Sequence, residues 1–177
     1  INFSNQLIYG IIIISFISLL INFFFPLSIL INSFLLILPI FFILKNLNYY
    51  FSYIFLKFVF LNAIIIFLLI AKSNIYRPDA LLYHLPYTGI LNSEKIIFGL
   101  SNLHFRFAHV SIIQYFSAFL NNFIFNIQGI VLGTALVASA VIINFLTYLI
   151  KYFQNKFFNF HFFFLFFIII FISYKMN

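Results

Sequence analysis

The sequence of 177 residues has little charge, no cysteine and only two carboxylates, and each shortage excludes a class of protein. Charged residues make up 6% of the chain, whereas a water-soluble domain carries roughly 25%, so a soluble globule is excluded. Without cysteine there are no disulfides, thiolate metal sites or thiol nucleophiles. Asp79 and Glu94 are the only acidic side chains, so this chain alone cannot run a mechanism that needs more of them.

The excess of basic residues does not indicate a nucleic-acid partner. Nine Lys and Arg give a net charge of +7, but they are spread along an apolar chain and do not form a basic face. In membrane proteins such charges lie at the ends of spans, where they fix orientation and meet anionic headgroups. The expected partner is therefore the lipid bilayer. Because the chain begins at Ile1 and has no signal peptide, we expect it to be the N-terminal part of a longer protein.

Long hydrophobic runs predict an all-α fold, a polytopic transmembrane helical bundle with about five spans. A spanning helix needs about 20 apolar residues, and five stretches qualify: 7–25, 27–44, 54–71, 129–150 and 157–174. These runs do not alternate as the strands of a barrel would. The expected organisation is three spans in residues 1–71, an extracytoplasmic loop with interfacial helices and the candidate site in 72–128, and two spans in 129–177.

Basic residues in the short loops set the expected orientation. Lys45 and Lys57 flank one turn, and Lys151 and Lys156 lie in another, so both turns are expected in the cytoplasm and the long loop on the outer side. Within that loop, 109–125 has polar residues at helical spacing, Ser111, Gln114, Ser117 and Asn121. We expect a helix lying in the membrane interface; the alternative is a sixth span. Gly129 and Gly133 predict close helix packing.

Chemically active side chains gather in one part of the loop. Both arginines, both carboxylates and three of the four histidines fall between Arg77 and His109. Ionisable groups beside a bilayer are costly to desolvate, so their concentration favours a site. The alternative is that any outer loop must be polar somewhere.

Asp79 is the candidate catalytic residue, because a carboxylate at the membrane surface can act as a general base. Its alternative role is a helix N-cap after Pro78. Tyr83 and His84 follow about one helical turn later and are expected to bind a substrate hydroxyl or phosphate, or else to anchor the loop at the interface.

Cations further along the loop are candidates for phosphate binding. His104 and Arg106 alternate in the sequence, which suits a phosphate clamp, with Arg77 as a further cation. The alternative for Arg106 is an ion pair with Glu94 or a lipid headgroup. A metal site from Asp79, Glu94, His84, His104 and His109 is not supported by any close ligand spacing, so no cofactor is assigned, although a divalent metal ion would be compatible with these residues.

Two strings in this segment resemble a family. Asp79-x3-Tyr83-His84-Leu85-Pro86 and Gly99-Leu100-Ser101-Asn102-Leu103-His104-Phe105-Arg106 resemble bacterial multi-pass membrane proteins related to GT-C-type glycosyltransferases. The resemblance implies that Asp79 is catalytic, that Asn102 joins the substrate-binding residues, and that the donor is a sugar on a polyprenyl phosphate. It also implies the bacterial inner membrane. Ala80 stands where many relatives have a second acid.

The expected function is therefore transfer of a sugar from a polyprenyl-phosphate-linked donor at the outer face of the membrane. One alternative is a lipid or small-molecule transporter or flippase, for which Asn22, Asn32 and Asn62 are the strongly polar mid-span candidates, with Lys57 near the end of a span. Another is a non-catalytic membrane assembly subunit.

Overall fold

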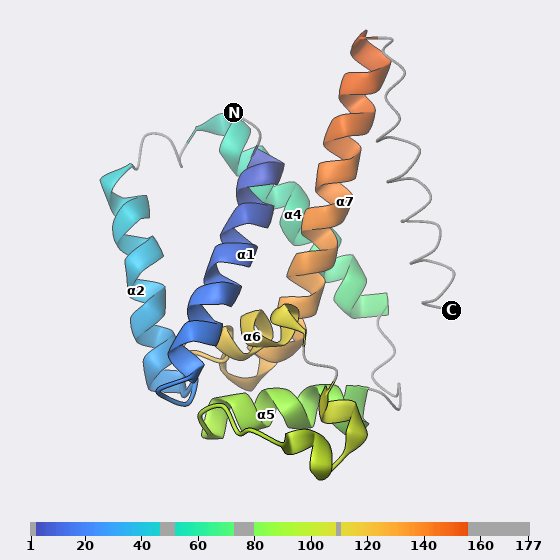
Figure 1. Cartoon of the computed structure of the whole chain (residues 1–177). Coiled ribbons are helices and arrows are strands. Elements are labelled where there is room, and N and C mark those ends of the chain that lie inside the picture. The colour runs from blue at the N-terminus through green and yellow to red at the C-terminus, as the bar shows by residue number, and fades with distance from the viewer. Residues whose placement is uncertain (1–2, 47–51, 73–79, 109–110, 156–177) are drawn as a thin grey trace.

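A computed structural model describes residues 3–46, 52–72, 80–108 and 111–155. Its four long helices are α1 (Phe3–Asn22), α2 (Ile29–Lys45), α4 (Tyr53–Lys72) and α7 (Gly129–Asn155). Figure 1 shows α1 and α7 running side by side, with α4 crossing behind them and α2 standing apart. The described residues contain no strand, so the expected all-α fold is confirmed for them.

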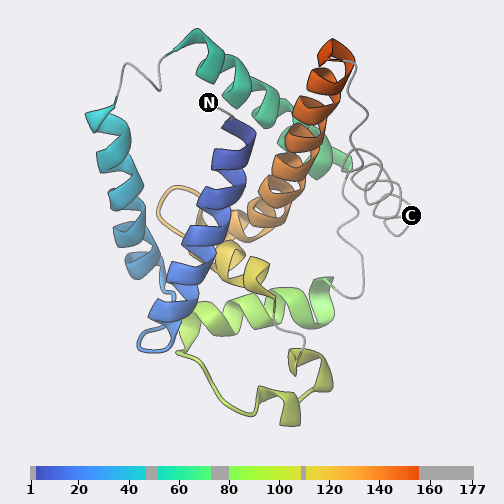
Figure 2. The ribbon, with the colours of Figure 1, turned by 45° about the horizontal axis from the view of Figure 1, so that its top comes forward.

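The short elements gather at one end of the long helices, around the turn that joins α1 to α2 (Figures 1 and 2). In chain order they are the π-helical turn η1 (Ala80–His84), α5 (Leu85–Ser93), the 3-10 turns η2 (Leu100–Asn102) and η3 (Phe105–Ala108), α6 (Ile112–Phe119) and the 3-10 turn η4 (Asn126–Gln128). Here α5 lies across the end of the bundle. We call this assembly the loop layer.

Three helices are long and apolar enough to cross a membrane, Phe3–Asn22, Tyr53–Ala71 and Asn126–Lys151. They coincide with the first, third and fourth expected spans. The second corresponds to α2, which has only 17 residues and contains Pro39. The fifth, 157–174, lies outside the described residues, so the total of five stays a prediction.

The surface of the long helices suits lipid. Four phenylalanines on α2 and α4 are each more than 60% exposed: Phe34, Phe41, Phe60 and Phe67. A continuous apolar surface of this kind is unfavourable in water but matches the acyl chains of a bilayer. Composition, helix length and exposed surface therefore agree on a membrane environment.

The chain reverses direction between α1 and α2 in a short turn, and the loop layer is hydrogen-bonded to this turn. Ser28 caps α2, its hydroxyl accepting the N–H of Ile31 at 3.5 Å. Leu27, just before the cap, is completely buried and donates its backbone N–H to the carbonyl of Leu91 on α5 at 2.8 Å. The turn is thus bonded to α5, which follows it by more than 60 residues.

Part of the polar stripe of 109–125 forms a buried helix, and its expected place in the membrane interface stays a prediction. Only Ile112–Phe119 forms α6, and residues 114–120 are all buried, because α6 packs against both α1 and α7. Its polar side therefore meets protein. Eight residues at a rise of 1.5 Å cover about 12 Å, too short for the alternative of a sixth span.

The close packing expected at Gly129 and Gly133 occurs against α6. A Cβ at Gly133 would lie 2.6 Å from Ser117 Oγ and 2.9 Å from Ser117 Cα. At Gly129 a Cβ would collide with the carbonyl of Leu120. Both glycines thus let α7 approach α6 at backbone distance.

Candidate functional site

Buried asparagines hold the loop layer on the α1–α2 turn. Asn22, at the end of α1, donates its side-chain amide to the carbonyls of Leu91 at 3.3 Å and Glu94 at 3.1 Å. The backbone carbonyl of Asn22 accepts the backbone N–H of Ile96 at 2.9 Å. The end of α1 is therefore joined to the last turn of α5 and the residues after it.

A second group of asparagines joins α2, α5 and α6. Asn32 donates its side-chain amide to the carbonyls of Leu27 at 2.7 Å, Ala118 at 2.9 Å and Asn121 at 2.9 Å. Asn92 donates to the same two carbonyls of Leu27 at 2.7 Å and Ala118 at 3.0 Å. Asn121 in turn donates to Asn92 Oδ1 at 3.0 Å. Three segments far apart in the sequence thus share one hydrogen-bond network.

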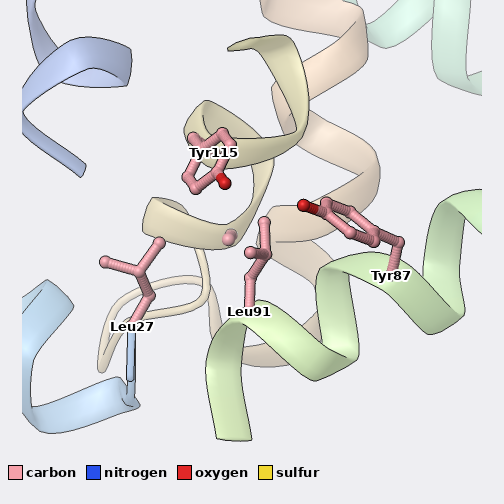
Figure 3. Close-up of a cluster of buried hydrophobic side chains, with 5 residues drawn as sticks. Leu27, Tyr87, Leu91 and Tyr115 are labelled. Atoms are coloured by element: carbon pink, nitrogen blue, oxygen red, sulfur yellow. The ribbon is translucent and has the colours of Figure 1, made fainter. Parts of the chain in front are cut away.

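An apolar cluster fills the space beside this network (Figure 3). Leu27, Tyr87, Leu91, Tyr115 and Ala118 are all buried in it. Tyr87 on α5 and Tyr115 on α6 both belong to this cluster, and burial, together with the neighbouring Tyr87 hydroxyl, raises the pKa of Tyr115. The Tyr115 hydroxyl therefore stays neutral and does not act as a base.

Tyr83 and His84 end the π-helical turn that leads into α5. Pro86, in the first turn of α5, has no N–H to offer the preceding turn, and the backbone before it is wound more widely, a geometry that often accompanies functional sites. The rings of Tyr83 and His84 lie 4.1 Å apart between centroids. His84 is exposed and Tyr83 is half-buried.

Arg106 reaches this pair from the other side of the loop. Its guanidinium carbon lies 5.3 Å from the centroid of the Tyr83 ring and 5.7 Å from that of Phe105. A guanidinium over an aromatic face is attracted by the electrons of the ring. Tyr83, His84 and Arg106, expected in the sequence to share a site, are brought together in the structure.

His84 is also bound from α6. Gln114 Nε2 lies 3.2 Å from His84 Nδ1, and Gln114 is 7% exposed. We call Tyr83, His84, Arg106 and Gln114 the cationic cluster. It joins η1, η3 and α6, so the surface that the sequence assigned to substrate binding depends on the packing of three separate segments.

His104 and Asn102 occupy other positions. His104 stacks on Phe105, with ring centroids 5.0 Å apart, and its Nδ1 accepts the backbone N–H of Arg106 at 3.3 Å. This bond shapes the turn that presents Arg106, so His104 supports the arginine through the backbone. Asn102 is exposed in η2, and the contacts that join the cationic cluster do not include its side chain.

Asp79 and Arg77, the remaining site residues expected from the sequence, lie outside the described residues. So does His109 of the metal set. Among the residues that are described, no three His, Asp or Glu side chains gather closely enough to hold a metal ion.

Sequence reasoning missed Gln114, Asn92 and the Tyr87–Tyr115 pair as parts of this region. Ser111 and Gln114 have the spacing of a capping box, in which the third residue of a helix bonds back to the cap, and this pattern could have placed the start of α6. No local signal shows that Asn92 or Tyr87 meets a residue more than 25 positions away.

The comparisons give a family without a described activity. A family model described as a domain of unknown function, DUF8201, matches residues 1–176. The chain therefore belongs to that family. No curated protein and no solved structure matches it significantly.

Proposed function

We propose that this member of the DUF8201 family is a membrane glycosyltransferase that takes a sugar from a polyprenyl-phosphate-linked donor at the outer face of the bacterial inner membrane. The observation that supports it is the convergence of Arg106 with Tyr83 and His84 at one end of a helical bundle. A phosphate at the end of an isoprenoid chain is an anion held at the edge of hydrocarbon. It requires a cation and hydrogen-bond donors next to an apolar surface, and this end of the molecule offers both.

Each member of the cluster has a role in this proposal. Arg106 offsets the phosphate charge with its guanidinium. His84 and Tyr83 supply further hydrogen-bonding groups. Arg106 and Tyr83 are half-buried, so the attraction of this arginine for phosphate is stronger than that of a fully solvated lysine.

In the proposed reaction, an acceptor hydroxyl attacks the anomeric carbon of the sugar. The new carbon–oxygen bond forms as the bond to the phosphate oxygen breaks, and the polyprenyl phosphate leaves with the electron pair. Asp79, four residues before Tyr83 in the chain, takes the proton of the hydroxyl. The exposed apolar surface of the long helices accommodates the isoprenoid chain.

The transporter alternative loses two of its three candidate residues. Asn22 and Asn32 donate to backbone carbonyls in the loop layer, so their amides serve the fold. The non-catalytic assembly subunit remains as the outcome that the following experiment separates.

The test uses the full-length protein in lipid nanodiscs and a short-chain fluorescent polyprenyl phosphate. Arg106→Gln is expected to weaken binding of this probe about tenfold or more. This expectation follows because a hydrogen bond to a charged group contributes roughly 1.5–3 kcal/mol, and about 1.4 kcal/mol corresponds to a factor of ten in affinity. The matched control is Lys95→Gln, which removes the same charge from an exposed position in the same loop and is expected to change binding less than twofold.

Transfer is tested separately with radiolabelled hexosyl polyprenyl phosphates. Asp79→Asn is expected to bind the probe as the wild type does and to lose sugar transfer. Unchanged transfer in Asp79→Asn would remove the catalytic role of that residue. Equal binding by Arg106→Gln and Lys95→Gln would remove the phosphate site and leave the assembly subunit.

A further inference from the structure

Gln114 is fixed at both ends of its side-chain amide. Its Oε1 accepts the backbone N–H of Ser111 at 2.8 Å, the capping bond at the start of α6. Its Nε2 lies 3.2 Å from His84 Nδ1. Gln114 is almost completely buried, whereas the His84 ring that it contacts is exposed.

These two contacts determine where the proton of His84 lies. A backbone N–H can only donate, so the oxygen of the Gln114 amide must face Ser111. The NH₂ group then faces His84, and since it too can only donate, Nδ1 must hold a lone pair. A neutral imidazole with a lone pair on Nδ1 carries its proton on Nε2.

We propose that Gln114 is a positioning residue that holds His84 in the Nε2–H tautomer, so that the exposed ring offers an N–H donor in the same cluster as Arg106. The further step, in which this N–H donates to a phosphate oxygen, rests on the proposed function. The assignment of the tautomer is independent of the proposed function, because it follows from the capping bond and the His84 contact alone.

The competing explanation is that Gln114 only caps α6. Gln114→Glu separates the two roles, because glutamate at this position of a capping box also accepts the N–H of the cap residue. Its second oxygen would face His84 Nδ1 and, being ionised in alkaline buffer, could only accept. The cap is retained while the preferred position of the histidine proton moves to Nδ1.

The readout is a long-range ¹H–¹⁵N correlation spectrum of the imidazoles in the full-length protein, labelled with ¹⁵N-histidine in detergent micelles at alkaline pH, where histidine is neutral. His84→Asn identifies the His84 signals by their loss. The wild type is expected to show a protonated Nε2 and an unprotonated Nδ1. In Gln114→Glu the signals are expected to exchange, with the circular dichroism of the helices unchanged.

Two results would overturn the inference: an Nδ1–H tautomer in the wild type, or the same tautomer in both proteins. Gln114→Leu, which removes both bonds, is expected to give a mixture of tautomers, and a pure Nε2–H signal in this variant would also count against it. Binding of the short-chain polyprenyl phosphate reports on the proposed function instead. A tautomer exchange in Gln114→Glu with unaltered binding would sustain the positioning role and refute the use of His84 by the phosphate.

Discussion

The loop layer and the apolar lengths of the long helices α1, α2, α4 and α7, here called the shafts, are stabilised by different interactions. In the loop layer, side-chain amides bind backbone carbonyls across segments that are 65 to 89 positions apart. Along α4, by contrast, none of the membrane-spanning window is buried, and exposed phenylalanines cover its surface.

The difference follows from the solvent. Lipid chains are as apolar as leucine, so packing one apolar helix on another gains little from the hydrophobic effect. Hydrogen bonds and close backbone approach must specify the arrangement instead. Among the described residues, most hydrogen bonds between side chains and distant segments lie at the end of the bundle that holds the candidate site. Within the shafts, Asn144 on α7 donates its side-chain amide to Asn5 Oδ1 on α1 at 2.7 Å. The rigidity of the site and the specificity of the fold therefore have a common origin.

The largest effect is expected when both asparagines that share carbonyls are removed. Asn32→Ala alone leaves the carbonyls of Leu27 and Ala118 bonded to Asn92, so it should cost about 1–2 kcal/mol, as should Asn92→Ala. In the double variant the Leu27 carbonyl loses both of its side-chain donors, while the Ala118 carbonyl keeps the backbone N–H of Asn121 at 3.1 Å. The cost should therefore exceed the sum of the two single costs by about 1 kcal/mol.

Reversible unfolding in mixed micelles measures these free energies for all four members of the cycle. Strict additivity would contradict the shared network, because it would mean that each asparagine stabilises the layer by itself.

A smaller loss is expected from closing the approach between α7 and α6. Gly133→Ala places a methyl group 2.6 Å from Ser117 Oγ and 2.9 Å from Ser117 Cα, and overpacking of this kind costs about 1–3 kcal/mol. Gly89→Ala is the matched control, since a Cβ there meets nothing within 4 Å and the helix propensity favours alanine by up to about 1 kcal/mol. The two variants should shift the thermal midpoint in opposite directions, and a shift of the same sign in both would show that α6 is free to move away.

The buried Tyr115 hydroxyl gives the loop layer a dependence on alkaline pH. The pKa of Tyr115 is raised above its ordinary value of 10.0, so above about pH 10 the unfolded chain releases this proton first and the stability of the native state falls with rising pH. Tyr115→Phe removes this titrating group, so the stability of the wild type relative to the variant should fall as the pH passes about 10. Parallel stability curves for the two proteins would contradict a buried neutral hydroxyl.

The sequence predicted the elements better than their packing. Hydrophobic length located α1, α4 and α7 to within a few residues, because crossing hydrocarbon fixes the length and composition of a helix locally. The stripe of Ser111, Gln114, Ser117 and Asn121 was expected on one helix face, and only Gln114 and Ser117 lie within α6, with Ser111 as its N-cap. What that face meets was not predictable, since its partners lie on η1, α5 and α7.

The candidate site shows the same division. The composition of the loop indicated Tyr83, His84 and Arg106 as members of one site, and the structure joins these three through ring and guanidinium contacts. It also separates Asn102 from them, although the motif placed it beside His104. An extended or turn geometry was expected to point His104 and Arg106 the same way. The backbone coils into η3 at Phe105, and the His104 imidazole accepts the backbone N–H of Arg106. Two functional residues separated by one position in the sequence do not distinguish a local 3-10 turn from an extended segment.

The smallest effect is expected on the shaft, and it tests whether its surface meets lipid. Phe60 on α4 is 69% exposed, whereas Leu27 in the loop layer is completely buried. If lipid surrounds α4, the Phe60 side chain has an apolar environment both before and after the helices separate, and Phe60→Ala should change the unfolding free energy in bicelles by less than about 0.5 kcal/mol. Leu27→Ala removes contacts that no lipid replaces and should cost about 2–5 kcal/mol. A loss at Phe60 as large as that at Leu27 would mean that protein covers this face of α4, and the contrast between a polar, specified end and a lipid-facing shaft would no longer describe the molecule.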